Sequence, residues 1–164
     1  MADAVYHTAA VVTVSDSCSR GEREDKSGPE VAQILEKQQF SVLSREVVPD
    51  DQIQIQNLLI RLAREVRLVV TTGGTGIAPR DVTPEATRSV CDRLLEGVSE
   101  QMRREGLKNT PFAVLSRGIC GVRGRTVIIN LPGSPAGAVE SLQAVSGLLQ
   151  HMIDLLSGKT SHGH

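Results

Sequence analysis

The stretch that most constrains the fold is residues 68–87, where a short apolar run leads into a glycine cluster and then a helix start. The run at 68–72 predicts a buried strand, since it is short, β-branched and bounded by glycine. The glycines that follow predict positive φ angles or a ligand close to the main chain. Thr83 and Pro84 predict a helix start, with Thr83 as N-cap. Strand, glycine loop and helix start in this order form a concave set of backbone N–H donors that binds anions.

The glycine loop departs from two common phosphate-binding patterns. It lacks the Gly-Lys-Ser/Thr ending of a P-loop, and Pro79 stands where the dinucleotide fingerprint has its third glycine or alanine. A tight turn without a ligand is the alternative, although Arg80 and Asp81 beside the glycines favour a site. We therefore expect the loop to bind phosphate in some other way.

Apolar runs and helix signals alternate along the whole chain. The predicted strands are residues 8–14, 41–48, 67–72, 111–116 and 125–131. The predicted helices begin at residue 27 and after Asp51, and further helices span 83–95, a short segment from 99 to 104, and 136–156. Gly97 is expected to end one helix, and residues 117–124 to form a glycine-rich connection. This alternation predicts an α/β fold with a mainly parallel sheet and helices on both faces.

Small and acidic residues follow several of these strands. Ser15 and Asp16 follow the first strand, Asp50 the second, and residues 73–81 and 132–134 two others. Ligands of such sheets bind in the crevice at the carboxyl ends of the strands. Turn formation by Ser15 and Asp16, or helix capping by Asp50, is the structural alternative for each alone.

The three aspartates Asp16, Asp50 and Asp81 can converge beside the glycine loops. Carboxylates next to phosphate-binding backbone suggest Mg²⁺, which takes oxygen ligands and keeps several waters. No Ser–His–Asp or Cys–His spacing stands out in the sequence, which disfavours covalent catalysis.

Composition bounds the class of protein. The chain has 164 residues, 40% hydrophobic and 23% charged, which suits one globular domain over residues 1–164 with a core at about 9–156. A net charge of −1 gives no general attraction for nucleic acid or an anionic membrane. No apolar run approaches the ~20 residues that span a bilayer, and no signal peptide is evident, so we expect a cytoplasmic protein. Three cysteines far apart predict reduced thiols.

Three polar segments carry simpler expectations. Residues 1–7 are expected to form a loosely held leader, and His162 and His164 to lie in a frayed tail rather than a metal site. Residues 19–27 are expected to form a solvated loop, with a lid over a ligand as the alternative.

Several motifs together carry a resemblance that covers about residues 9–156. They are Val14-Ser15-Asp16, Val48-Pro49-Asp50, Thr72-Gly73-Gly74-Thr75-Gly76 with residues 79–87, Thr110-Pro111-Phe112-Ala113, Leu115-Ser116-Arg117, and residues 129–135. The chain resembles the molybdopterin adenylyltransferase family, which includes bacterial enzymes of molybdenum cofactor synthesis and the gephyrin G domain. Ser134 is a departure, because relatives often carry Asn or Gln at this position.

The resemblance implies a three-layer, Rossmann-like domain of the molybdenum cofactor biosynthesis fold that assembles as a homotrimer. It implies transfer of AMP from ATP to the terminal phosphate of molybdopterin, with release of pyrophosphate and with Mg²⁺. The important family aspartates map onto Asp50 and Asp81, which we expect to be catalytic and to hold the metal. The residues expected to line the pterin and nucleotide pockets are Ser15, Asp16, Thr72, Gly73, Gly74, Thr75, Gly76, Ser116, Arg117, Pro132, Gly133 and Ser134.

Two other functions stay open at this point. One is a non-catalytic molybdopterin carrier or trimeric scaffold, although two aspartates facing a phosphate favour an enzyme. The other is a general nucleotide-binding protein, by fold analogy alone. An enzyme of this kind could also hand its product to a molybdenum-inserting enzyme.

Overall fold

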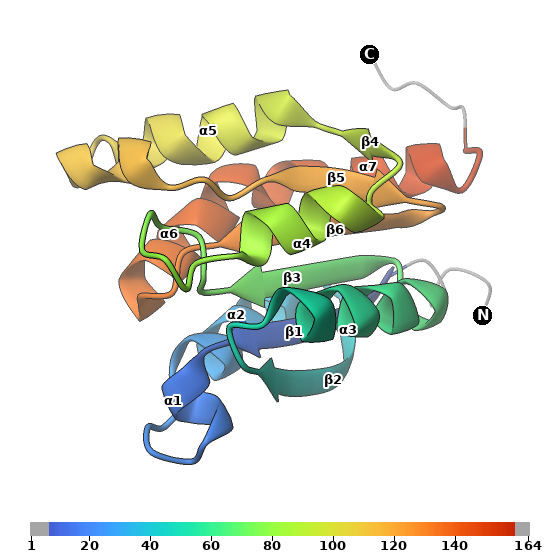
Figure 1. Cartoon of the computed structure of the whole chain (residues 1–164). Coiled ribbons are helices and arrows are strands. Elements are labelled where there is room, and N and C mark those ends of the chain that lie inside the picture. Colours follow the sequence, from blue (N-terminus) through green and yellow to red (C-terminus); the bar gives the residue numbers. More distant parts are fainter. Residues whose placement is uncertain (1–6, 160–164) are drawn as a thin grey trace.

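The predicted α/β architecture is confirmed by a computed structural model, which describes residues 7–159. The leader up to residue 6 and the two terminal histidines lie outside the described residues. Six strands form one sheet in the order β2-β1-β3-β6-β5-β4, with helices on both faces (Figure 1). No helix in this described part is long and apolar enough to cross a membrane.

The parallel part of the sheet consists of four strands. They are β1 (Thr8–Val14), β2 (Ser41–Val48), β3 (Leu68–Thr72) and β6 (Thr126–Leu131). The side chains of β3 and β6 are buried throughout, as expected of parallel strands covered on both faces, whereas the edge strand β2 alternates between exposed and partly buried positions.

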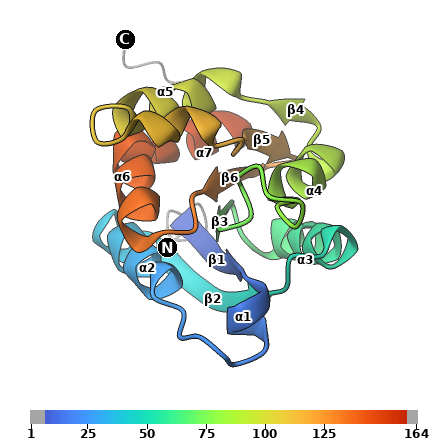
Figure 2. The same ribbon diagram turned by 60° about the vertical axis from the view of Figure 1, so that its left-hand side comes forward.

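Helices form the two outer layers on either side of the sheet, as the turned view in Figure 2 shows. On one face lie α2 (Ser27–Lys37), α6 (Pro135–Val145) and α7 (Leu149–Leu156), which pack on Val11, Val70 and Ile129 of the sheet. On the other lie α3 (Gln52–Glu65) and α4 (Thr83–Val90), which pack on Val12, Val69 and Ile128. Because side chains alternate across a strand, neighbouring residues of one strand pack into the hydrophobic cores on opposite faces of the sheet.

The region around Gly97 differs from its prediction. Helix α4 ends at Val90, not at residue 95, because Cys91 has an extended backbone. The residues that follow it pair with another strand. The short strand β4 (Arg93–Leu94) follows, antiparallel to β5 (Cys120–Arg123). Gly97 does not end a helix. It lies in the first turn of α5 (Glu96–Gly106), where a glycine is well tolerated.

Three further predictions were wrong. Residues 111–116 form no strand but a 3₁₀ helix, η2 (Pro111–Leu115), whose first turn is capped by the Thr110 hydroxyl accepting the Phe112 N–H at 3.2 Å. The connection at 117–124 contains β5, which pairs antiparallel with β6. The helix predicted for 136–156 is interrupted by a 3₁₀ turn, η3 (Ser146–Leu148), at a Ser-Gly pair with low helix propensity.

Candidate functional site

The predicted site residues gather at the carboxyl ends of adjacent parallel strands. Ser15 follows β1, Asp50 follows β2, Gly73 follows β3 and Pro132 follows β6. Backbone bonds hold these ends together, since Ser15 N–H donates to Val48 O at 2.9 Å and Gly73 N–H to Leu131 O at 3.0 Å. The structure therefore brings the predicted site residues together at the sheet edge where such folds bind ligands.

The glycine loop after β3 requires its glycines. Gly73 and Gly74 have φ values of +95° and +69°, which disfavour any side chain. A Cβ on Gly73 would collide with the carbonyl oxygen of Val14, and one on Gly74 with Oγ1 of Thr83. With glycine at these two positions, the loop backbone can approach its neighbours and a ligand more closely than it could with any other residue there.

Thr83 holds this loop instead of capping the helix. Residue Val82 is the N-cap of α4, and it makes no side-chain capping bond. The buried Thr83 hydroxyl donates to Gly73 O at 2.9 Å, and the Thr83 N–H donates to Gly74 O at 3.1 Å. The predicted capping role was wrong, and the residue ties the start of α4 to the loop.

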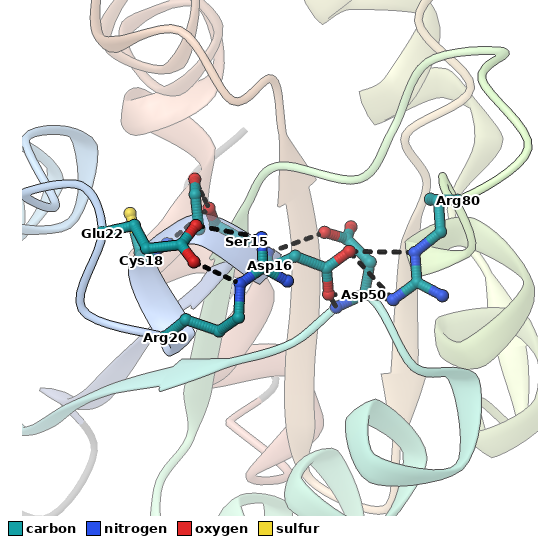
Figure 3. A network of polar contacts seen from close by, with 8 residues as sticks. Ser15, Asp16, Cys18, Arg20, Glu22, Asp50 and Arg80 are labelled. Carbon is teal, nitrogen blue, oxygen red and sulfur yellow. Dashed lines mark hydrogen bonds and ion pairs between the residues drawn. The ribbon is translucent and has the colours of Figure 1, made fainter.

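Asp16 and Asp50 bind each other through backbone and side chain (Figure 3). The Asp16 N–H donates to Oδ2 of Asp50 at 3.0 Å, and the Asp50 N–H donates to Oδ1 of Asp16 at 2.9 Å. The Arg80 guanidinium then donates twice to Asp16, from Nε and Nη2, each at 2.9 Å. Arg80 thus neutralises Asp16 and links the glycine-loop segment to the end of β1.

The two carboxyl groups differ in their pKa shifts. The side-chain hydrogen bond from Arg80 lowers the pKa of Asp16. Burial raises the pKa of Asp50, and the nearby charges of Asp16 and Asp81 raise it further. Within residues 7–159, Asp50 forms no ion pair of its own. A cation beside Asp50 would remove this disadvantage of its charged form.

Asp50 and Asp81 have the donor set for such a cation. One oxygen of Asp81, Oδ2, accepts the Ala78 N–H at 3.0 Å, and the other, Oδ1, has no hydrogen-bond partner among residues 7–159. Oδ1 of Asp50 also has no partner in this part of the chain, and it lies 3.1 Å from the point that a Cβ on Gly74 would occupy. No group of three or more His, Cys, Asp and Glu residues that could hold a metal occurs in the described part of the chain. Two carboxylates fit Mg²⁺ bound together with phosphate and water oxygens.

Two cavities meet at the loops after β3 and β6. The larger has a volume of about 530 Å³ and extends toward α5, η2 and α6, and Ser116 lies in its wall. The smaller has a volume of about 340 Å³ and extends toward Ser15, Asp50, Thr72 and α2. The two cavities share four lining residues: Gly74, Asp81, Gly133 and Ser134. A ligand in one cavity would thus meet a ligand in the other at this shared rim.

A family model described as "Probable molybdopterin binding domain" matches residues 10–151, most of the chain. The chain belongs to this molybdopterin-binding family.

Several proteins similar to this chain carry the names of enzymes. A Helicobacter pylori molybdopterin adenylyltransferase is 43% identical over 152 residues, which cover 90% of this chain and 86% of the relative. An Escherichia coli molybdopterin adenylyltransferase is 41% identical and covers 82% of this chain and 71% of the relative. The crystal structure of the molybdopterin biosynthesis enzyme MoaB from Thermus thermophilus is 48% identical, with a TM-score of 0.88 over 93% of this chain and 98% of that one.

Some relatives are much longer than this chain. It is 41% identical to the Drosophila melanogaster molybdenum cofactor synthesis protein cinnamon, but it spans only 26% of that protein. It is 38% identical to Dictyostelium discoideum gephyrin and spans 22% of it.

Arg117, predicted to line a ligand pocket, lines neither of these two cavities but borders a third hollow of about 460 Å³. Its Nε donates to Gly76 O at 2.8 Å, its Nη2 to Asp81 O at 2.8 Å, and its Nη1 pairs with Glu85. The Arg117 N–H also donates to Thr75 O at 2.8 Å. Through these bonds Arg117 holds the backbone of the glycine loop and of Asp81 in place.

The Ser134 side chain makes a helix-capping hydrogen bond that was not predicted from the sequence. Its Oγ accepts the Gly137 N–H at 3.1 Å and so caps α6. Asn, which the family resemblance predicts at this position, caps a helix equally well. Because Ser134 lines both cavities, its hydroxyl can still donate a hydrogen bond to a phosphate at the shared rim.

Three site residues were missed from sequence. Asp25 accepts the Thr13 hydroxyl at 2.7 Å and the Gly28 N–H at 3.0 Å, and Ser27 donates to Gly133 O at 2.7 Å. These bonds fasten the end of the 19–27 loop against the smaller cavity, and the lid role stays a prediction. The third residue, Glu140, lines the larger cavity from α6. A single polar residue on a helix gave no signal for it.

Proposed function

We propose that this chain is a molybdopterin adenylyltransferase, which transfers AMP from ATP to the terminal phosphate of molybdopterin and releases pyrophosphate. The observation that carries the proposal is the meeting of two cavities at Gly74, Asp81, Gly133 and Ser134. A reaction between two bound phosphates needs such a common rim. The adenylyltransferase relatives, at 41–43% identity over most of the chain, support the same reaction.

For this reaction the protein mainly has to align the two reacting phosphates. A phosphate oxygen of molybdopterin forms a bond to the α-phosphorus of ATP, and the bond from that phosphorus to the bridging oxygen breaks. The electron pair leaves with pyrophosphate. A phosphate monoester is mostly ionised at neutral pH, so no protein base is needed. The residues at the rim position two anions and donate hydrogen bonds to their oxygens.

The walls of the cavities suggest which ligand each one takes. The larger cavity includes Met102, Phe112 and Leu115, which suit the faces of a pterin ring. The smaller includes the cations Arg23 and Lys26, which suit nucleotide phosphates, together with the carboxylates of Glu24 and Asp25. In this arrangement the reacting phosphates lie beside the backbone N–H groups of the glycine loop.

We also propose that Asp50 and Asp81 hold Mg²⁺. When bound, this ion would neutralise charge on the phosphates and on the leaving pyrophosphate. The free oxygens of both aspartates and the glycine-lined space between them support the assignment. The homotrimer, the cytoplasmic location and the hand-over to a molybdenum-inserting enzyme stay predictions that rest on the family resemblance.

The experiment that tests the function is an assay with purified protein, molybdopterin, ATP and Mg²⁺. Adenylylated molybdopterin and pyrophosphate should form in equal amounts, and Asp81→Asn should form neither while keeping its fold. Pterin binding without product from the native chain would instead support a carrier or scaffold. Product from the mutant at a near-native rate would refute the role of Asp81.

A further inference from the structure

The larger cavity contains a carboxylate that the reaction does not use. Glu140 lies on α6 and is half-buried in the cavity wall. Among the described residues its carboxylate makes no hydrogen bond or ion pair. Arg103 lines the same cavity but donates to the backbone oxygens of Ser116 and Gly118, at 3.4 and 3.2 Å. A partly exposed carboxylate without a protein partner is available to accept hydrogen bonds from a ligand in the cavity.

A second polar group in this wall also lacks a partner. Ser99 of α5 is 4% exposed, and its Oγ has no hydrogen-bond partner among residues 7–159. It lines the cavity with Glu140, and it also borders the third hollow, of about 460 Å³. Helices α5 and α6 pack directly against each other, so the two groups belong to neighbouring helices of the cavity wall. A buried hydroxyl without a partner is a second sign of a ligand.

The mouth of this cavity is apolar. Ile77 and Phe112 are 70% and 73% exposed, and both line the cavity. Large apolar side chains in solvent around a cavity favour a ligand with flat apolar faces. The cavity thus combines apolar sides with a hydrogen-bonding end.

We propose that Glu140 recognises the 2-amino-4-oxo edge of the pterin ring, with Ser99 as a further hydrogen-bond partner. The ring N3–H and one N–H of the 2-amino group point the same way, and they match the two oxygens of a carboxylate. The proposal rests on the proposed function, because that function makes the occupant of this cavity a pterin.

The position of Glu140 on its helix suits this arrangement. It lies five residues beyond Pro135, the first residue of α6, which is roughly 8 Å along the axis. This is the scale of a fused heterocycle. A pterin bound at Glu140 would therefore extend its phosphate toward the rim at Gly133 and Ser134.

The test compares two ligands that differ at one edge. We would titrate 6-hydroxymethylpterin phosphate and its 2,4-dioxo counterpart, a lumazine, by fluorescence in the absence of ATP. The native chain should bind the pterin on the order of 10- to 100-fold more tightly, because the lumazine turns an oxygen toward the carboxylate. Glu140→Gln should reverse the preference, since its amide accepts the N3–H and donates to the 2-oxo group.

Controls separate recognition from folding and from catalysis. Glu30→Gln, on the exposed side of α2, should leave both affinities unchanged. Ser99→Ala should weaken both ligands by a similar factor. In the adenylyl-transfer assay, Glu140→Gln should raise the KM for molybdopterin more than it lowers kcat. The inference would be overturned if the Glu140→Gln variant folded and kept the native preference for the pterin. This outcome does not depend on whether the chain transfers AMP.

Discussion

Asp16 and Asp50 each donate a backbone N–H to the carboxylate of the other, across the ends of β1 and β2. This reciprocal pair fixes the Asp50 side chain through neutral donors rather than through a cation. Arg80 neutralises the other member, Asp16. The full charge of Asp50 therefore remains available to a ligand at the glycine loop, in a position where burial makes that charge unfavourable alone.

The first prediction follows from this geometry. Asp50→Asn should lower kcat by about 100-fold or more, because the amide is neutral and a poorer ligand for a cation. The free energy of unfolding should change by less than about 1 kcal/mol, since an amide oxygen still accepts the Asp16 N–H. Steady-state kinetics and urea unfolding on the same preparation measure both quantities.

The neighbouring Asp51 supplies a matched control. Its carboxylate caps α3 by accepting the Gln54 N–H at 3.0 Å, and it is exposed. Asn caps a helix as well as Asp, so Asp51→Asn should keep both the stability and the rate. Equal losses of rate in the two variants would show that general charge near the site matters, and would contradict a specific role for Asp50.

The second prediction concerns Gly73. Gly73→Ala should lower the free energy of unfolding by about 2–4 kcal/mol, because its φ of +95° is strained for alanine and the new Cβ would collide with Val14 O. Gly147→Ala is the control, since a Cβ there meets nothing within 4 Å. Urea unfolding should show a change of less than about 0.5 kcal/mol for the control. Similar values for the two variants would contradict the close approach of β1 to the loop.

The sequence predicted the parallel part of the sheet well. The expected strands at 8–14 and 41–48 have the same bounds as β1 and β2. The polar residues predicted after the strands lie at one edge of the sheet, because topology brings the ends of parallel strands together. These features depend on local composition and on one general rule of α/β folds.

Pairing and side-chain direction were harder to predict because they depend on distant residues. Residues 120–123 look like a loop, yet they form β5 through pairing with β4 and β6. Residues 111–115 are apolar enough for a strand, but Pro111 and the Thr110 cap start a 3₁₀ turn instead. Arg117 sits in a family motif, but its direction is set by Glu85 and by carbonyl groups of the glycine loop.

The third prediction tests the bracing role of Arg117. Arg117→Lys should lower kcat by about 10- to 100-fold, because one ammonium group cannot bind two carbonyls and Glu85 together, and Asp81 would shift. Amide hydrogen exchange at residues 74–82 should become faster. Arg104→Lys, on the exposed side of α5, should change neither. A higher KM with unchanged exchange would mean that Arg117 contacts substrate directly.

The last prediction concerns pH and the pair between Glu85 and Arg117. The hydrogen bond from Arg117 lowers the pKa of Glu85 from its ordinary value of 4.5. The folded chain thus binds this proton less readily than the unfolded chain, so the contribution is complete above the unfolded pKa and is lost as the pH falls through the lowered folded pKa. Both side chains are partly exposed, so Glu85→Gln should cost about 0.5–1 kcal/mol of unfolding free energy at about pH 7 and almost nothing at about pH 3. Urea unfolding across this range measures the difference, with Glu100→Gln on the exposed side of α5 as the control. A cost for Glu85→Gln that stayed constant down to the lowest pH would mean that the pair acts through packing rather than charge.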